Sequence, residues 1–161
     1  MQLDRLDLKI LHFIQTRGRL ANKELAELVN LSPSACHQRF QRLQSDGWIK
    51  SFSAEVDIER LCAPVQAIAT LALSNHSPET FNVLEGLVES MPEALEAYTV
   101  SGSFDFIIRF ACPNMSRYMA LTSSLIKDCP AISNISTHVI LKQNKRFSGF
   151  PINHLVGQQM K

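Results

Sequence analysis

The sequence predicts an α+β protein, in which a helical domain precedes a domain of alternating strands and helices. Within residues 20–47, two segments carry apolar residues at helical spacing, and one turn signal separates them. From residue 65 onward the apolar pattern becomes β, α, β, β, α, β in that order. We therefore expect a helical domain at residues 1–50, a linker strand or hinge at 51–63, an α+β domain at 64–142 and a tail at 143–161.

Residues 20–47 are typical of a helix-turn-helix. Leu25 and Val29 fall on the apolar face of a first short helix. Ser32 can then cap the free amides of a second helix, and Pro33 suits the first helical position because its missing N–H needs no partner there. The second helix is therefore predicted to begin at Pro33.

The segments on either side of this motif predict its support. Residues 3–16 carry an apolar stripe that predicts a first helix, and Gly18 is expected to end it. Asn22 is the nearest residue able to cap the helix that follows. Residues 48–57 favour a strand, which would form either a short wing or a tether to the next domain; we favour the tether.

The second helix of the motif has two unlike sides. Its inward side is small and apolar, and consists of Cys36, Phe40 and Leu43. Its outward side holds Ser34, Gln38 and Gln41, flanked by His37 and Arg42. Residues 33–45 contain no carboxylate, and an α-helix fits the DNA major groove, where Gln binds adenine edges and Arg binds guanine or phosphate. This side indicates DNA binding; the alternative is a solvated polar face on an ordinary helical hairpin.

Composition narrows the class of protein. The net charge is only +1, whereas strong non-specific binders of nucleic acid are far more basic, so dimer-based recognition with modest affinity per subunit is expected. The four cysteines show no metal-ligand spacing, which favours buried free thiols in a reducing compartment. No segment approaches the roughly 18 apolar residues that span a bilayer, and no cofactor motif is present, so we expect a cytoplasmic protein without membrane contact.

The α+β domain is predicted to be ferredoxin-like. Its strands are expected at residues 65–73, 95–101, 104–112 and 132–142, and its helices at 78–91 and 114–128. Both helices would cover one face of an antiparallel sheet. A second copy of the sheet would cover the other face, which makes a homodimer the expected state. The tail has no clear period, and is either disordered or packed on a partner through Phe147, Phe150 and Leu155.

The segments LDLKILHFIQTRGRL, ELAELVNLSPSACHQRFQRLQSDGWI and YTVSGSFDF follow one another along the chain. With them the chain resembles the leucine-responsive regulator and asparagine regulator (Lrp/AsnC) family of prokaryotic transcription factors, from about residue 3 to residue 141. The resemblance implies a sequence-specific DNA-binding transcriptional regulator, as a homodimer that assembles into tetramers or octamers. It also implies control by a small-molecule effector, usually an amino acid.

Carried over by position, the resemblance implies that double-stranded DNA meets the outward side of the second helix. The residues that would face bases are Ser34, His37, Gln38 and Gln41. Arg39 and Arg42 would lie near phosphates, although Arg39 projects close to the core side and has bracing of the helix pair as its alternative role. Two major-groove sites of a dimer would be centred about 10 base pairs, or a multiple, apart.

The resemblance places the effector around the turn at residues 100–105, in a cleft between neighbouring ligand domains. Amides near Gly102 would hold an α-carboxylate, Asp105 would hold an α-ammonium, and Ser101 and Thr137 would add hydroxyls. Ser103 stands where the family often has an acidic residue. The alternative is structural, in that Gly102 supplies a left-handed turn and Asp105 ties it down.

Two other functions remain open. Siroheme decarboxylases share the two-part architecture and use His and Arg in the second domain, where His138 and Arg109 would be the candidates here. Neither residue has a second basic or His partner in a recognisable motif, so we expect that the chain is not an enzyme. The other alternative is an amino-acid sensor or assembly module that does not bind DNA.

Overall fold

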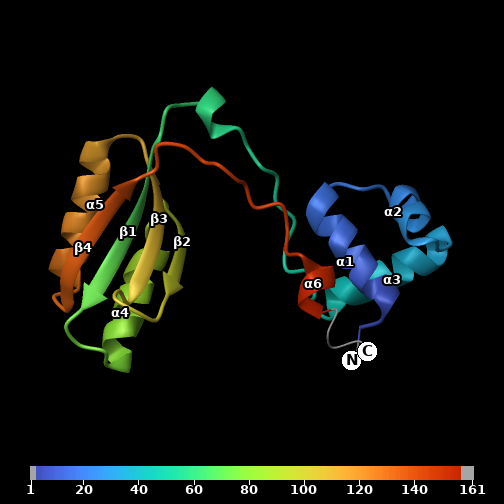
Figure 1. Ribbon diagram of the computed structural model, residues 1–161, viewed down its shortest axis with the longest axis horizontal. Coiled ribbons are helices and arrows are strands. Elements are labelled where there is room, and N and C mark those ends of the chain that lie inside the picture. Colours follow the sequence, from blue (N-terminus) through green and yellow to red (C-terminus); the bar gives the residue numbers. More distant parts are fainter. Residues whose placement is uncertain (1–2, 157–161) are drawn as a thin grey trace. The chain divides into compact units, whose positions relative to one another are not determined.

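The computed structural model describes residues 3–156, which form two compact units (Figure 1). Residues 3–56 and 145–156 make the helix-turn-helix unit, and residues 57–144 make the α+β unit. The chain therefore passes between the units twice, and its C-terminal segment belongs to the unit in which it began. Among the residues that the structure describes, no helix is long and apolar enough to cross a membrane.

Three helices build the helix-turn-helix unit: α1 (Arg5–Arg17), α2 (Asn22–Val29) and α3 (Pro33–Ser45). Asp4 caps α1, since its side chain accepts the N–H groups of Leu6 and Asp7, and Gly18 ends that helix at φ +62° as predicted. One apolar cluster holds the three helices together, and its buried members are Ile10, Ile14, Leu25, Ala26, Val29, Cys36 and Leu43.

The turn between α2 and α3 follows the sequence prediction. Asn30 adopts the left-handed conformation (φ 56°, ψ 49°) and ends α2. The Ser32 hydroxyl accepts the N–H of Ala35, and Pro33 occupies the first turn of α3.

The predicted cap of α2 is wrong, because the Asn22 amide instead donates to the Pro33 carbonyl oxygen at 2.9 Å. Ala21 occupies the cap position instead, so α2 begins at Asn22, and Glu24 accepts the N–H of Ala21 at 3.1 Å.

The strand predicted within residues 48–57 does not form. Residues 50–57 are extended or irregular and exposed, and a short 3₁₀-helix follows at Ile58–Arg60. The strand-like composition is not enough here because no neighbouring strand pairs with the backbone N–H and C=O groups of this segment. The described residues of the helix-turn-helix unit accordingly contain no wing strand.

The α+β unit has the predicted ferredoxin-like order of elements. Its strands are β1 (Val65–Leu73), β2 (Ala94–Thr99), β3 (Phe106–Cys112) and β4 (Ile132–Val139), and its helices are α4 (Pro78–Glu89) and α5 (Met115–Asp128). The sheet is antiparallel, in the order β2-β3-β1-β4. β1 has the predicted bounds, whereas β4 ends at Val139 rather than at residue 142.

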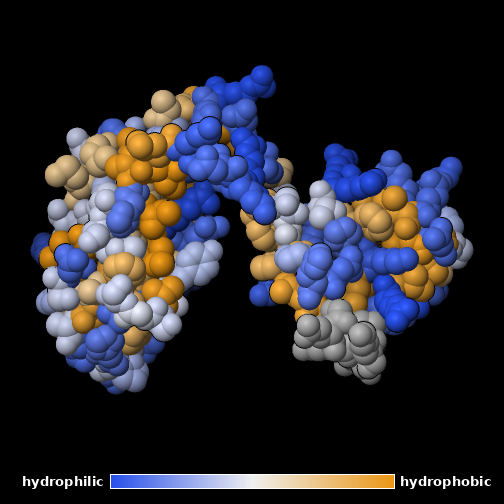
Figure 2. Space-filling view, in the orientation of Figure 1, coloured by the Kyte–Doolittle hydropathy of each residue, from blue (hydrophilic) through white to orange (hydrophobic). Residues whose placement is uncertain are grey.

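Both helices cover one face of this sheet. Alternate residues of β1 and β3, among them Leu71 and Phe110, are buried beneath Leu84 of α4 and Leu125 of α5. The intervening residues point to the opposite, open face. That face holds Gln66, Ile68, Thr70, Ala72, Glu96, Tyr98, Ile107, Arg109, Ala111, Asn134, Ser136 and His138. Figure 2 shows hydrophobic residues in a run down the visible side of this unit.

The four cysteines differ in their exposure. Cys36, Cys112 and Cys129 are buried free thiols, and burial raises the pKa of the Cys36 and Cys112 thiols above the ordinary value. Cys62 is exposed in the segment before β1, so the prediction of a buried thiol is wrong for it. The difference follows from location, since Cys62 lies outside any regular element that could bury it.

The tail packs on α1 of its own chain. Gln15 binds Phe150 twice: its amide donates to the Phe150 carbonyl at 2.7 Å, and its carbonyl accepts the Phe150 N–H at 2.9 Å. Arg146 pairs with Glu55 at 2.9 Å, and a short helix, α6 (Ile152–Val156), follows. Residues 145–156 therefore have a defined place in the helix-turn-helix unit, where the sequence alone gives no period.

Candidate DNA-binding surface and effector turn

The predicted base-facing residues share one exposed side of α3. Ser34, His37, Gln38 and Gln41 are all exposed, while Cys36 and Leu43 are fully buried on the opposite side. (The Ser34 hydroxyl also lies 3.2 Å from that of Ser32.) The cap at Ser32 and the burial of the apolar side fix the rotation of the helix, so that its hydrogen-bonding side faces solvent.

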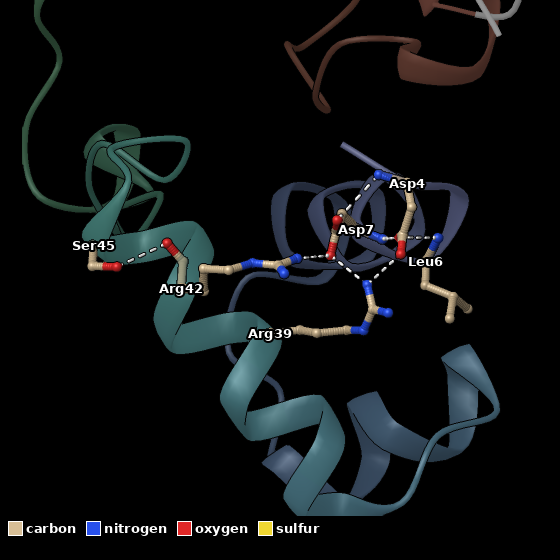
Figure 3. A network of polar contacts seen from close by, with 6 residues as sticks. All are labelled: Asp4, Leu6, Asp7, Arg39, Arg42 and Ser45. Atoms are coloured by element: carbon tan, nitrogen blue, oxygen red, sulfur yellow. Dashed lines mark hydrogen bonds and ion pairs between the residues drawn. The ribbon is translucent and has the colours of Figure 1, made fainter. Parts of the chain in front are cut away.

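The two arginines of α3 behave differently, because both reach back to α1 (Figure 3). Arg39 Nη1 lies 2.6 Å from Asp4 Oδ2 and 2.9 Å from Asp7 Oδ1. Arg42 Nη2 lies 2.8 Å from the same Asp7 oxygen. These ion pairs match the bracing role that was the alternative for Arg39, and they extend that role to Arg42.

Asp7 is the centre of this network and is 1% exposed. Its second carboxylate oxygen accepts the N–H of Asp4 at 3.1 Å, so that one carboxylate joins the start of α1 to the middle of α3. Burial raises the pKa of Asp4, but the Asp7 N–H and the Arg39 guanidinium outweigh it and hold that pKa below its ordinary value. Asp4 and Asp7 together raise the pKa of Arg39, which therefore carries its full charge.

Sequence reasoning identified both arginines but missed their partners. From the sequence alone, Asp4 and Asp7 are simply acidic residues that are favoured at the start of a helix. Their spacing of three residues carries a further signal, because the capping box that it allows turns both carboxylates toward one side of the α1 terminus. The sequence separation of 32 residues between Asp7 and Arg39 hides the pairing.

The predicted effector turn is a tight connection between β2 and β3. Gly102 has φ +121°, which requires glycine, and the Val100 N–H donates to the Asp105 carbonyl oxygen at 2.9 Å. Asp105 Oδ2 accepts the N–H of Leu73, at the end of β1, at 2.7 Å, and Asp105 Oδ1 lies 2.8 Å from His76 Nε2. The hydrogen bond from Leu73 is the main cause of the lowered pKa of Asp105.

The structure brings only some of the predicted effector residues together. Ser101, Gly102 and Ser103 are exposed side by side at the turn, next to Asp105. Thr137 lies on β4, two strands or about 10 Å from β3, and its hydroxyl is 2.8 Å from that of Tyr118. His76 was missed because its contact with Asp105 depends on how the segment after β1 packs against the turn between β2 and β3, which the sequence pattern does not reveal.

The residues named for an enzyme lie on the open sheet face. Arg109 and His138 are each opposite Ile68, one on either side of it. Arg109 is already engaged by Glu96 at 3.5 Å and by Gln66 at 3.4 Å. Within residues 3–156, no group of three or more His, Cys, Asp and Glu side chains is placed to hold a metal ion.

Comparison with known proteins assigns the two units to two families of domain. A winged helix-turn-helix DNA-binding family matches residues 3–50. The Lrp/AsnC ligand-binding domain family matches residues 66–150, which is more than half of the chain. The chain belongs to the Lrp/AsnC family.

Relatives within the Lrp/AsnC family match over nearly the whole chain. The leucine-responsive regulatory proteins of Salmonella typhimurium and Escherichia coli K12 are each 31% identical over 144 residues, covering 89% of this chain and 88% of theirs. A Neisseria meningitidis transcriptional regulator, solved as its L-Met complex, has a TM-score of 0.86 at 27% identity, over 96% of this chain and 99% of that one. An AsnC-family regulator from Agrobacterium tumefaciens has a TM-score of 0.85 at 29% identity, over 95% and 99%.

These matches establish the class of function. The chain is an Lrp/AsnC-type DNA-binding transcriptional regulator, with an N-terminal helix-turn-helix and a C-terminal ligand-binding domain. The relatives are named as regulators rather than as enzymes.

Proposed function

We propose that this regulator reads the DNA major groove with the exposed side of α3, as a homodimer whose state responds to an amino acid or a related small metabolite. The observation that carries the proposal is the exposed, carboxylate-free side formed by Ser34, His37, Gln38 and Gln41. Amide and hydroxyl groups at this spacing can meet successive base edges, because an α-helix fits the major groove.

Base recognition falls mainly to the two glutamines. A Gln side chain both donates and accepts, so it can bind an adenine edge through two hydrogen bonds. Gln38 and Gln41 are one helical turn apart on the same exposed side. His37 and Ser34 flank them and add shorter polar groups. Arg39 and Arg42 lie on the flank of α3 near the core, with their guanidinium groups at Asp4 and Asp7.

The open face of the sheet supports the homodimer. Ile68 and Ile107 lie near its centre, and Tyr98 is 54% exposed on β2. The Thr70 hydroxyl is buried there without a partner among the described residues. A second copy of the sheet would cover these apolar side chains and bring a new donor or acceptor within reach of that hydroxyl.

The turn at residues 100–105 supports a ligand of the amino-acid class. Its exposed residues around Gly102 offer backbone amides that suit a carboxylate, and Asp105 adds a negative charge beside them. The Neisseria meningitidis regulator was solved with L-Met, which supports the same class here. Because the resemblance places the effector between neighbouring ligand domains, Thr137 and the turn need not meet within one chain.

Replacing both glutamines tests the DNA-reading surface. We expect the double variant Gln38→Ala, Gln41→Ala to lose roughly 1–3 kcal/mol of discrimination between bases per glutamine, because each bidentate contact contributes about that much. The measurement is genomic footprinting of the native and variant proteins, followed by titration of one recovered site against a scrambled duplex.

The matched control is Gln44→Ala, which removes the same side chain from the last turn of α3. We expect the control to keep the native footprint, and both variants to keep the native sedimentation coefficient. A native footprint from the double variant would remove these glutamines from base recognition.

Thermal shift against the twenty amino acids tests the effector. An amino acid that binds the folded protein raises its melting temperature by mass action, by an amount that grows with concentration. We expect at least one amino acid to do so at millimolar concentration, and Gly102→Ala to weaken that response because it distorts the turn. No shift with any amino acid would refute the effector assignment and leave the DNA-reading surface unaffected.

A further inference from the structure

Both arginine side chains of α3 are paired with carboxylates of α1, although the arginines themselves are partly exposed. Arg39 and Arg42 are the two residues of this helix with a permanent positive charge. Both donate to Asp7 Oδ1, at 2.9 and 2.8 Å, and Arg39 also donates to Asp4 Oδ2 at 2.6 Å. The exposed side of α3 therefore presents hydrogen-bonding groups with no free guanidinium charge beside them.

Asp7 is suited to hold these arginines firmly. Its side chain is 2% exposed, so its carboxylate depends on protein donors instead of water. Moving either guanidinium away would leave this buried carboxylate short of donors, which is strongly unfavourable. The second oxygen is bound to the Asp4 N–H, which fixes the carboxylate orientation from the α1 side.

Arg39 and Arg42 lie where their guanidinium groups, if released from Asp7, would be close to bound DNA. A step of about 100° per residue places Arg39 and Arg42 between the buried side of α3, which carries Cys36 and Leu43, and the exposed glutamine side. From such a flank, a released guanidinium has the length and flexibility to reach a phosphate beside the groove. Each phosphate contact releases counterions and strengthens binding to DNA of any sequence.

We propose that Asp7, assisted by Asp4, is a positioning residue for recognition: it withholds Arg39 and Arg42 from DNA phosphates and thereby lowers affinity for non-specific DNA. The proposal rests on the proposed DNA-reading function of α3. It explains how a helix with two arginines can favour base contacts over backbone contacts, in a protein whose net charge is only +1. Binding energy at the operator then comes mainly from the glutamine side and from dimerisation.

The salt dependence of DNA binding tests whether Asp7 keeps Arg39 and Arg42 from binding DNA phosphates. The probe is a short duplex of random sequence, titrated between about 50 and 200 mM KCl, where each phosphate contact contributes about 0.9 to the slope of log K against log[salt]. In the native background, Arg39→Gln and Arg42→Gln should each leave this slope unchanged. Asp7→Asn should steepen it by about 0.9 and the double variant Asp4→Asn, Asp7→Asn by about 1.8.

Over that salt range, these changes correspond to additional losses of affinity of about 3-fold and about 12-fold. Adding Arg42→Gln to Asp7→Asn should restore the native slope, because it removes the released cation. Asp46→Asn is the matched control, since it removes an exposed carboxylate at the end of the same helix. A purely structural role for Asp7 would weaken binding at every salt concentration without changing the slope.

Three results would overturn the proposal. A slope reduced by about 0.9 in Arg39→Gln or Arg42→Gln would show that the arginine already binds phosphate, and this result holds even if Asp7→Asn fails to fold. A native slope in a folded Asp7→Asn protein would show that Asp7 does not withhold either arginine from DNA phosphates. Absence of DNA binding by the native protein at low salt would refute the proposed function itself, and this inference with it.

Discussion

Asp105 joins the turn at residues 100–105 to the segment at residues 71–76, which is distant in sequence. Its carboxylate accepts the Leu73 N–H at the end of β1 and lies against His76, while its backbone N–H donates to the Leu71 carbonyl oxygen. The side chain is 18% exposed, so it combines a structural contact with access to solvent. At the residue scale, one group thus both fixes the turn and borders the predicted effector position.

We expect Asp105 to make stability depend on acid pH. Its pKa is lower in the folded chain than in the unfolded chain, so its contribution is complete above the unfolded value of about 3.9 and is lost as the pH falls through the folded value. Asp105→Asn should cost roughly 1.5–3 kcal/mol at pH 7, because the Leu73 N–H would lose its charged acceptor.

Urea unfolding between about pH 2 and pH 7 measures this effect. The difference in unfolding free energy between the native protein and Asp105→Asn should shrink below about pH 4. The control is Asp128→Asn, which removes an exposed carboxylate of the same unit. A difference that stays constant across the whole range would contradict the assigned charged state.

Individual residues could be found from the sequence, but their partners could not. The helical period placed Arg42 beside the outward side of its helix, and the family resemblance pointed to Arg39, Gly102 and Asp105. Asp7 and His76 were not identified as their partners, because ion pairing across 29 to 32 residues depends on how the elements pack. Periodicity describes one element at a time and carries no information about that packing.

At the scale of elements, the tail contact depends on a single glycine. Gly149 has φ +104°, and a Cβ there would come within 2.8 Å of Gln15 Cδ. Gln15 itself is held by its two hydrogen bonds with Phe150, so it has little freedom to move aside. The tail can therefore approach α1 this closely only with glycine at this position.

We expect Gly149→Ala to release the tail from α1. The backbone strain amounts to about 1–3 kcal/mol, and the clash with Gln15 adds to it. Amide hydrogen exchange measures the result, because the Phe150 N–H should lose its protection. Gly47→Ala has a comparable φ of +77° but meets no atom within 4 Å, so it should leave the Phe150 amide protected. Unchanged protection in Gly149→Ala would contradict the contact.

Elements were predicted best where their own residues determine them. β1 has the predicted bounds because Pro64 precedes it and its alternate residues from Ala67 to Leu73 are apolar and buried. Ser32 and Pro33 likewise set the start of α3 locally. The strand predicted within residues 48–57 failed because a strand needs a partner, and a sequence window does not show whether one is present.

At the scale of the whole molecule, the proposed homodimer uses the open face of the sheet. Ile107 lies between Thr70 and Tyr98 across three strands, away from the helices. Ile68 is the neighbouring apolar residue on the same face. A face with these residues is favourable to bury and unfavourable to leave in water.

We expect Ile107→Asp to convert the protein to monomers. A carboxylate facing a second sheet would lose its water, which raises the dissociation constant by about 100-fold or more. Sedimentation equilibrium measures the mass of the particle. Val83→Asp is the control, because Val83 is 49% exposed on α4, and it should keep the native mass. A native mass for Ile107→Asp would place the subunit contact elsewhere.

Residues 145–156 return to the first unit, so a truncation at the C-terminus affects the helix-turn-helix half of the regulator. A premature stop codon after Asn144 would leave the βαββαβ sheet whole, yet it would remove the Phe150 backbone that Gln15 binds on the DNA-reading half. For the same reason, a fluorophore attached at Asn153 would report on the helix-turn-helix, although the ligand-binding sheet precedes it in the gene.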